Sequence, residues 1–158
     1  MLSTASKQNT MTIKQLSIFL ENSPGRLLQV TKALGKAGIN LKALNLAGVH
    51  DFGVLRLICS DLHKARNIAM KNQWPARVDE VLAVRIPDNP GSLADILQPL
   101  SENRIDVDYM YAFTRFSTSE AVIIFGFKEI EEANKVLQSC NVTLVGAEDF
   151  KALESKGN

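Results

Sequence analysis

The chain carries one order of hydrophobic patterns twice. Apolar and polar residues alternate over 16–20, as expected for a strand with one buried face, and the alternation returns over 82–86, 66 positions later. Apolar residues at helical steps of three and four follow at once, over 27–37 and again over 93–100. An internal repeat of about half the chain is therefore predicted.

The remainder of each half continues in the same way. A second strand is expected to start at Ile39 and at Ile105, and a third strand to cover 54–59 and 121–127. Each half then shows a second amphipathic helix and a last strand. The apolar helix positions are Leu62, Ala65 and Ala69 in the first half and Ile130, Ala133 and Leu137 in the second, and the last strands are expected at 74–80 and 142–147. The predicted order of elements is βαββαβ, twice.

This order predicts an α+β fold of two tandem ferredoxin-like βαββαβ repeats, each an antiparallel four-stranded sheet with both helices on one face. Half of the 158 residues is little for a sheet with an uncovered face, so the repeats are expected to pair through their sheets. The expected division is a disordered extension at 1–11, a first repeat at 12–80, a second repeat at 81–150 and a C-terminal tail at 151–158.

The junction between the two repeats contains no turn signal. Residues 76–86 include no Gly, Pro or Asn, although the last strand of the first repeat and the first strand of the second both fall there. We therefore expect one extended segment to serve both sheets.

Composition and charge indicate which partners the protein does not bind. Hydrophobic residues make up 46% and charged residues 22%, and the formal charge is +1, which argues against nucleic acid as the main partner. No apolar run is long enough to span a bilayer, and the polar first ten residues lack the apolar centre of a secretory signal. Cys59 and Cys140 are expected to be buried free thiols. These features indicate a cytoplasmic protein that contacts neither membrane nor nucleic acid.

The sequence shows no catalytic constellation. It has no GxSxG, GxxxxGK[ST], HExxH or GxGxxG motif, and the two histidines, His50 and His63, are expected at the surface. An acid, base or nucleophile needs a partner that positions it, and none is evident. We therefore expect no enzyme activity, no cofactor and no metal.

The two loops that join the first strand of each repeat to its first helix are alike. Ser23 and Asn89 are good N-caps before a proline, and a glycine, Gly25 or Gly91, follows each proline. Glycine in a first helical turn lowers helix stability, so its use twice suggests that another group approaches the backbone. A helix N-terminus suits a carboxylate, and a zwitterionic amino acid would also need acceptors for its ammonium group. Such acceptors are expected at nearby strand ends, on Asn22, Asp88, Asn40 and Asp106.

The run N-S-P-G-R-L-L with a later G-I-N-L, and its counterpart D-N-P-G-S-L with R-I-D-V, resembles the ACT domain. The resemblance extends over about residues 12–150 and is to tandem ACT proteins that bind amino acids. It implies non-enzymatic binding of a free amino acid at an interface between ACT units, and hence a sensor or regulator of amino-acid metabolism. The ligand-binding residues that it implies are Asn22, Ser23, Gly25, Arg26, Leu27 and Asn40 in the first repeat and Asp88, Asn89, Gly91, Ser92, Leu93 and Asp106 in the second.

Three further residues lie on strands. Arg56 interrupts an apolar strand and is expected to be solvated or ion-paired on the open face of the sheet. Tyr109 and Tyr111 share one strand face, because alternate residues point the same way, and are expected to pack between the repeats. An isologous homodimer is the expected assembly for a sheet protein with spare edges.

Three other functions are compatible with this order of elements. A regulatory subunit resembling the small subunit of acetolactate synthase would bind an amino acid but act through a partner enzyme. An RNA-binding module would place aromatic residues such as Phe125 and Phe127 on its central strands, but the charge is nearly balanced. An acylphosphatase-like enzyme would need more than Arg26 to cradle a phosphate. The sensor and the regulatory subunit are preferred.

Overall fold

The computed structural model describes residues 11–113 and 119–154. Two βαββαβ units follow one another and a short helix ends the described chain. The elements are β1 (Ile13–Glu21), α1 (Arg26–Lys36), β2 (Leu41–Val49), β3 (Phe52–Cys59), α2 (Leu62–Lys71), β4 (Ala76–Pro87), α3 (Ser92–Glu102), β5 (Tyr109–Phe113), β6 (Glu120–Gly126), α4 (Ile130–Ser139), β7 (Thr143–Leu144) and α5 (Ala147–Glu154). The expected disordered extension at 1–11 lies outside the described residues except for Met11.

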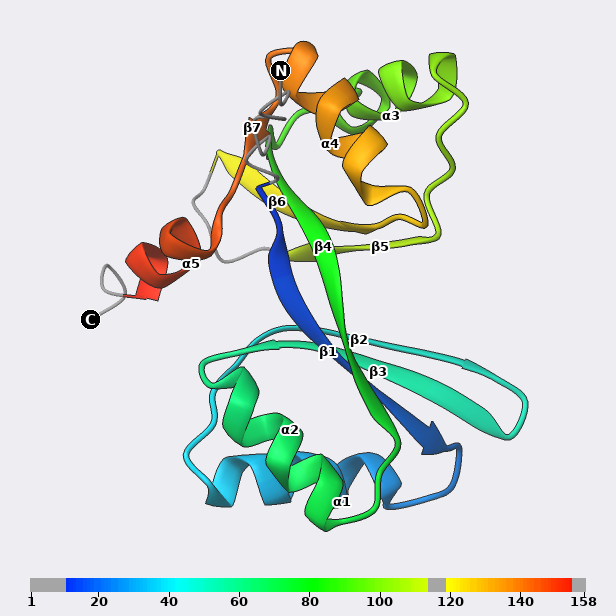
Figure 1. Ribbon diagram of the computed structural model, residues 1–158, viewed down its shortest axis with the longest axis vertical. Helices are drawn as coiled ribbons and strands as arrows, with labels where there is room; N and C mark the ends of the chain where they lie inside the picture. The colour runs from blue at the N-terminus through cyan, green and yellow to red at the C-terminus, as the bar shows by residue number, and fades with distance from the viewer. Residues whose placement is uncertain (1–10, 114–118, 155–158) are drawn as a thin grey trace, which may run out of the picture.

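Each unit has the ferredoxin-like strand order. In the first unit the order is β2-β3-β1-β4, and in the second it is β5-β6-β4-β7, with antiparallel pairing throughout. The two crossovers of each unit are helical, so α1 and α2 lie on one face of the first sheet, and α3 and α4 on one face of the second (Figure 1). The predicted fold class is confirmed.

Strand β4 belongs to both sheets. Its first part, from Ala76 to Val81, pairs with β1, and its second part, from Leu82 to Pro87, pairs with β6. Without a turn residue in this segment the backbone stays extended over 12 residues. The expectation of one extended segment is therefore confirmed, whereas the division into 12–80 and 81–150 stays a prediction.

The helix-covered face of each sheet has its own hydrophobic core. Alternate residues of β1 point toward α1 and α2, and alternate residues of the second part of β4 point toward α3 and α4. The first core is built on Leu16, Ile18, Leu20, Val30, Leu34, Leu55 and Leu57. The second is built on Leu82, Val84, Ile86, Ile96, Leu100, Phe125 and Leu137. These are the positions whose periodicity predicted the elements.

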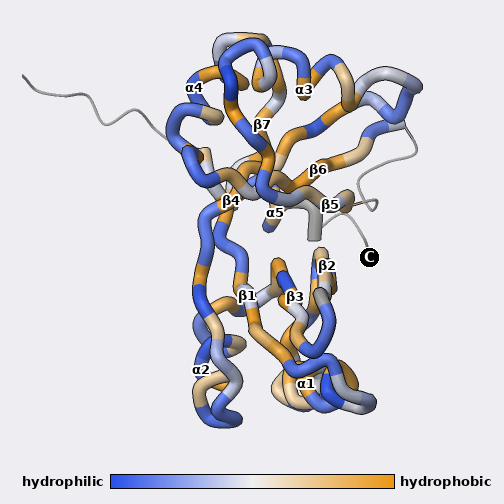
Figure 2. The backbone as a smooth tube through the Cα atoms, turned by 90° about the vertical axis from the view of Figure 1, so that its right-hand side faces the viewer, coloured by the Kyte–Doolittle hydropathy of each residue, from blue (hydrophilic) through white to orange (hydrophobic). Residues whose placement is uncertain are grey.

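A third core lies between the two sheets. The faces that α1–α4 do not cover turn toward each other, so that α1 and α2 lie at one end of the molecule, α3 and α4 at the other, and the sheets in the middle (Figure 2). The buried residues of this core are Ile13, Ala43, Ile58, Val81, Ala83, Tyr111, Val122, Ile124, Val145 and Phe150. The expected pairing of the repeats through their sheets is therefore a stacking of open faces.

Polar side chains lie inside this third core and connect the two units. Gln15 and Ser17 of β1 are completely buried. The Gln15 amide nitrogen donates to the Tyr109 hydroxyl at 2.9 Å, and the Tyr111 hydroxyl donates to the Gln15 amide oxygen at 2.7 Å. Ser17 in turn donates to Asp79 at 2.6 Å. A buried polar group that loses its partner is costly, so this network favours one alignment of the sheets.

Tyr109 is held between the two units by its ring as well as its hydroxyl. The Arg56 guanidinium lies 3.8 Å from the centre of the ring, a cation–π contact. The ring also covers Gly126, where an added Cβ would collide with the Tyr109 ring. The expected packing of Tyr109 and Tyr111 between the repeats is confirmed. Arg56 does lie on the open face, but there it stacks on an aromatic ring.

The C-terminal segment departs from the expected strand at 142–147. Strand β7 has only two residues, after which the Val145 N–H donates to the Ala83 carbonyl and the side chain of Val145 enters the third core. The Asp149 carboxylate accepts from the Gly146 N–H at 3.0 Å, which starts α5. Helix α5 carries Phe150 into the space between the sheets. Residues 147–154, which were expected to be the end of a strand and a tail, therefore form a helix over the interface.

We predict that the chain cannot be divided at residue 80. Fragments 11–80 and 81–158 should be unfolded or aggregated, because the cut interrupts β4 and exposes the third core, whereas the intact chain should melt in one transition. Circular dichroism and amide NMR spectra of the fragments test this. Two soluble monomers with dispersed amide spectra would show that the units are independent domains.

We also predict that Tyr111 makes the protein sensitive to alkali. Burial raises the pKa of Tyr111, the neighbouring Tyr109 raises it further, and Arg56 opposes the rise. The folded protein therefore keeps a proton that the unfolded chain releases near pH 10, so the free energy of unfolding should fall as the pH rises above about 10. Tyr111→Phe should be less stable at pH 8 by about 1 kcal/mol, because it loses the bond to Gln15.

Denaturant titrations at pH 8 and pH 11 give the measurement for both proteins. The stability advantage of the unmodified protein over Tyr111→Phe should shrink at pH 11. An advantage of the same size at both pH values would contradict this role of the tyrosine.

Candidate functional site

The two Pro-Gly loops do not end in the expected side-chain caps. Gly25 has φ 85° and Gly91 has φ 92°, and neither of these N-cap residues makes a side-chain hydrogen bond. The expectation of Ser23 and Asn89 as N-caps is therefore wrong. A positive φ favours glycine because other residues are strained there. An added Cβ would meet nothing within 4 Å at either position, so backbone conformation and not crowding explains the repeated glycine.

The backbones of the two loops share three hydrogen bonds, although the bond of 2.9 Å from Ser23 N–H to Glu21 O is found in the first loop alone among the described residues. In the first pair of matching bonds, Asn22 N–H donates to Asp51 O (2.7 Å) and Asp88 N–H donates to Ser119 O (2.9 Å). In the second pair, Arg26 N–H donates to Ser23 O and Ser92 N–H donates to Asn89 O, at 3.2 Å each. In the third pair, Gln29 N–H donates to Gly25 O (2.9 Å) and Asp95 N–H donates to Gly91 O (3.1 Å). The side chains differ, because Arg26 in the first loop corresponds to Ser92 in the second. Only the first loop brings a cation.

The two loops lie far apart. The first lies near the start of β4, where the Phe19 N–H donates to the Pro75 carbonyl at 2.8 Å. The second directly follows Pro87, the last residue of β4. A strand of 12 residues spans roughly 35–40 Å, and the loops occupy opposite ends of the molecule (Figure 1). One ligand therefore cannot contact both loops of one chain.

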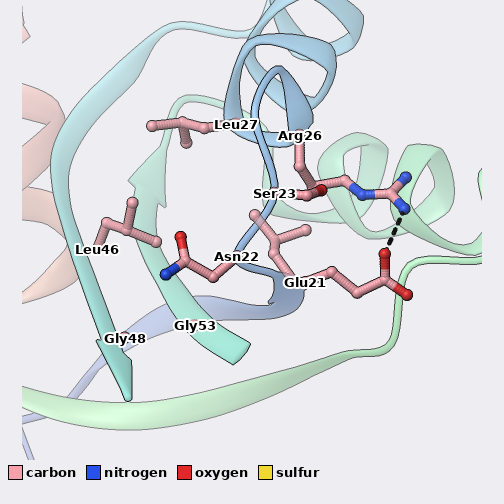
Figure 3. A pocket seen from close by; sticks show the side chains of 9 residues that line it. Glu21, Asn22, Ser23, Arg26, Leu27, Leu46, Gly48 and Gly53 are labelled. Carbon is pink, nitrogen blue, oxygen red and sulfur yellow. Dashed lines mark hydrogen bonds and ion pairs between the residues drawn. The ribbon is translucent and has the colours of Figure 1, made fainter. Parts of the chain in front are cut away.

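A cavity of about 250 Å³ opens beside the first loop, between the start of α1 and the edge strand β2. It is lined by Leu20, Glu21, Asn22, Ser23, Arg26, Leu27, Leu46, Gly48 and Gly53. In Figure 3, Leu27 and Leu46 face each other across it and Asn22 closes it below. The structure thus brings together four of the predicted residues, namely Asn22, Ser23, Arg26 and Leu27.

Polar groups line one side of this cavity. Arg26 forms an ion pair of 3.0 Å with Glu21, and both also line a second cavity of about 270 Å³ on the side of Trp74. The charged ends of the pair point away from Leu46 (Figure 3). The Asn22 amide nitrogen donates to the His50 carbonyl at 3.0 Å, which leaves its amide oxygen as the acceptor for a ligand.

Two glycines face each other under the cavity. Gly48 of β2 pairs with Gly53 of β3, and Gly53 also pairs with Leu20 of β1. Sequence reasoning missed both, although glycine inside a strand is a known sign of a close approach. In the second unit Ala121 stands opposite Ile86, where the first unit has Gly53 opposite Leu20. An added methyl group therefore distinguishes the second loop from the first.

The expected position of Asn40 and Asp106 beside the loops is wrong. Strands β1 and β2 are both antiparallel to β3 and thus parallel to each other, so the start of β2 lies far from the end of β1. Asn40 exchanges two hydrogen bonds of 3.0 Å with Ser60 there. Asp106 precedes β5, whose first residue pairs with Gly126 at the end of β6. Position along the chain did not reveal the end of the sheet at which each residue lies.

The second loop has a different setting. Asp88, Asn89 and Gly91 are exposed, and Leu93 packs against the second core. Its Asp88 N–H bonds to the carbonyl of Ser119, the residue at which the described chain resumes. The geometry of a site is therefore described for the first loop alone.

Other candidate chemistry is sparse in the described residues. His50 and His63 are exposed as expected, and no group of three or more His, Cys, Asp or Glu within 11–113 and 119–154 could hold a metal ion. Cys59 is half-buried and Cys140 exposed, so the expectation of two buried thiols is wrong. In the same part of the chain, no helix combines the length and the apolar composition needed to cross a membrane.

Comparison with known proteins agrees with this fold. The sequence profile of the ACT domain pair matches residues 11–154. Protein BT0572 from Bacteroides thetaiotaomicron has a similar crystal structure, with a TM-score of 0.81 and 39% identity over 88% of this chain and 95% of that one. The search of curated proteins found no match.

Two regulatory subunits of aspartate kinase share the fold. The subunit from Thermus thermophilus, in its ligand-free form, has a TM-score of 0.58 and 13% identity over 83% of this chain and 93% of that one. The subunit from Thermus flavus has a TM-score of 0.56 and 15% identity over 80% and 91% of the two chains.

We predict that Gly25 is required by its backbone conformation. Gly25→Ala should lower the free energy of unfolding by about 1–2 kcal/mol, because alanine is strained at a positive φ. Gly35→Ala, in the interior of the same helix and with open space around its added Cβ, should raise it by about 0.5–1 kcal/mol. Urea denaturation measures both. An unstrained, fully stable Gly25→Ala protein would contradict the backbone explanation.

Proposed function

The chain belongs to the ACT domain-pair family, and on that premise we propose that its first Pro-Gly loop binds a free amino acid and that the protein acts as an amino-acid sensor. ACT domain pairs are regulatory and not catalytic domains, and two of the proteins with this fold are regulatory subunits of aspartate kinase. The observation that carries the proposal is the cavity of about 250 Å³ in which Asn22, Ser23, Arg26 and Leu27 converge.

The carboxylate of the ligand is placed at the start of α1. The first N–H groups of a helix have no partner within the helix, and the Arg26 N–H already bonds to Ser23, so the N–H groups of Leu27 and Leu28 are the donors on offer. The ion pair between Arg26 and Glu21 is partly exposed, at 33% and 62% of the two side chains, and contributes on the order of 1 kcal/mol to stability. Arg26 can therefore turn to a carboxylate at little cost.

The other groups that line the cavity indicate where the ammonium group and the side chain of the ligand bind. The Asn22 amide oxygen and the Glu21 carboxylate are acceptors for an ammonium group. Leu20, Leu27 and Leu46 offer an apolar surface, which favours an apolar side chain. A cavity of this volume is smaller than the usual sites for drug-sized molecules and suits a ligand of amino-acid size.

A second copy of the chain is the proposed lid of this site. Strand β2 is the edge of the first sheet, and it exposes Leu44 and Leu46 to the extent of 52% and 47%. An edge strand with exposed apolar residues is a surface that pairs readily with another chain. Because the two loops of one chain are far apart, an interface between ACT units at this loop requires a second chain. A homodimer through β2 meets that requirement.

We also propose how the protein passes on the signal that an amino acid has bound. The chain either acts alone or, as a regulatory subunit, passes the signal to a partner enzyme of amino-acid metabolism. Exposed Leu28 and Phe52 extend the apolar surface around the site, which favours a protein partner. The free thiols of Cys59 and Cys140 fit a cytoplasmic location. Affinity purification of the tagged chain, with and without amino acids, separates a subunit from a free-standing sensor.

We predict that at least one of the twenty amino acids stabilises the protein and that its amide does not. A free concentration of about 100 times the dissociation constant should raise the free energy of unfolding by roughly 2.7 kcal/mol. Thermal-shift screening followed by calorimetry measures this. The sensor proposal fails if no amino acid gives either a melting shift or heat.

Two variants locate the site. Gly53→Ala places a methyl group 3.4 Å from Leu46 and gives this position the alanine that the second unit has at Ala121. Arg26→Gln removes the cation. Each variant should weaken binding about tenfold or more. Ala121→Gly and Lys36→Gln are the matched controls and should leave the affinity unchanged. Equal effects of Gly53→Ala and Ala121→Gly would move the site away from the first loop.

A further inference from the structure

The two units of the chain carry opposite net charges. Residues 11–81, up to the end of the first part of β4, contain ten Lys and Arg and five Asp and Glu, a formal charge of +5. Residues 82–154, from the second part of β4 onward, contain six Lys and Arg and twelve Asp and Glu, a formal charge of −6. The charge of +1 for the whole chain therefore describes neither unit.

Many of the positive charges of the first unit lie on its helices. Helices α1 and α2 carry six Lys and Arg and no Asp or Glu. Five of these side chains are exposed and form what we call the basic layer, namely Lys32, Lys36, Lys64, Arg66 and Lys71. The Lys64 ammonium group donates to the Ala37 carbonyl at 2.6 Å, which joins the start of α2 to the end of α1. None of the five forms an ion pair with a described residue, so no direct partner neutralises their charge.

The helices of the second unit are acidic. Helices α3 and α4 carry four Asp and Glu and one lysine, Lys135. The four acidic side chains are exposed and form what we call the acidic layer, namely Asp95, Glu102, Glu131 and Glu132. Within the described part of the chain they form no ion pair, and Glu102 only accepts from Gln98 at 2.9 Å. The two layers lie at opposite ends of the molecule (Figure 2).

The electrostatics of the single helices does not explain this distribution. A helix N-terminus favours carboxylates, and a helix C-terminus favours cations. Glu102 is nevertheless the last residue of α3, and the first turn of α2 contains Lys64 and no acidic residue. Lys32 and Lys36 are four residues apart, a spacing at which like charges destabilise a helix. Charges that are unfavourable within the chain are typical of a surface with a function outside it.

We propose that copies of the chain associate end to end, with the basic layer of one copy on the acidic layer of the next. The two layers have opposite charge, and neither has a partner within its own chain. Met70, which is 61% exposed beside Lys71, adds a side chain of a type that is enriched at interfaces. Because the two layers differ, the contact is head-to-tail and repeats into a ring or a filament.

A second copy fits the basic layer better than a nucleic acid does. A nucleic acid at this layer would be repelled by the second unit with its formal charge of −6, and the charge of +1 for the whole chain gives little long-range attraction to phosphates. A second copy instead offers its acidic layer and turns its basic unit away. The contact is also distinct from the dimer proposed through β2, which depends on exposed leucines at a strand edge.

Sedimentation velocity of the full chain at several protein concentrations measures the association. Exposed charges act over about 30 Å at 0.01 M salt and about 3 Å at 1 M salt. The apparent dissociation constant for self-association should therefore be lower by about tenfold or more at the lower salt concentration. Sedimentation that is the same at both salt concentrations overturns the proposal.

A variant at the edge of β2 separates this contact from the proposed dimer. Leu44→Asp places a charge on the strand edge, far from both layers along the chain, and should keep the salt-dependent association. Loss of that association in Leu44→Asp would assign it to the β2 edge and overturn the proposal.

Charge reversal identifies the two layers. Arg66→Glu should weaken the association about threefold or more, whereas Lys151→Glu, the same type of change on α5, should leave it unchanged. The basic-layer variant combines Lys32→Glu with Arg66→Glu, and the acidic-layer variant combines Glu102→Lys with Glu132→Lys. Each of these variants alone should lose the salt-dependent association.

A mixture of the two double variants, both made in Leu44→Asp, tests the head-to-tail contact. It should form a one-to-one complex and no larger species, because each variant supplies the intact layer that the other lacks. A mixture without a complex overturns the proposal. Equal losses in Arg66→Glu and Lys151→Glu would indicate a general charge effect and also overturn it.

A fluorescently labelled DNA duplex tests the other occupant of the basic layer. Its anisotropy at low salt should show weaker binding than the self-association of the chain. Tighter binding of the duplex, lost in the basic-layer variant, would assign the layer to nucleic acid and overturn the proposal. Neither layer belongs to the amino-acid site, so amino-acid binding measured by calorimetry should be the same in Lys151→Glu and Arg66→Glu.

Discussion

The contact between the uncovered faces of the two sheets is the constraint on which the rest of the structure depends. A four-stranded sheet with both helices on one side leaves an apolar face uncovered. In this protein each repeat covers that face of the other repeat in the same chain. Apolar packing alone would permit several alignments. The hydrogen bonds of Gln15 with Tyr109 and Tyr111, together with Arg56 on the Tyr109 ring, select one of them.

This stacking also explains the form of β4 and the placement of the cavities. A strand that serves both sheets must run from one to the other without a turn, so the loop after β1 and the loop after β4 lie at opposite ends of the molecule. Another cavity lies at the start of β1, beside α5. The cavity beside the first loop and the cavity beneath α5 are thus separated by the length of the first sheet.

The two loops share a backbone turn but differ in the side chains at equivalent positions. Three backbone hydrogen bonds match between them, and both glycines have the positive φ that the turn requires. The difference lies in a few side chains, since Arg26 and Gly53 of the first unit correspond to Ser92 and Ala121 of the second. Under the proposed function, this cation and the space of one methyl group distinguish the loop that binds the carboxylate from the one that does not.

The sequence by itself determined the elements, their order and the shared strand, because periodic burial and the absence of turn residues at 76–86 are local properties of the chain. It also located the loop residues Asn22, Ser23, Arg26 and Leu27. The tertiary structure decided which distant residues meet, and it removed Asn40 and Asp106 from the loops and added Gly48 and Gly53. Strand direction and register place residues at one end of a sheet or the other, and these depend on pairings between strands that no local pattern encodes.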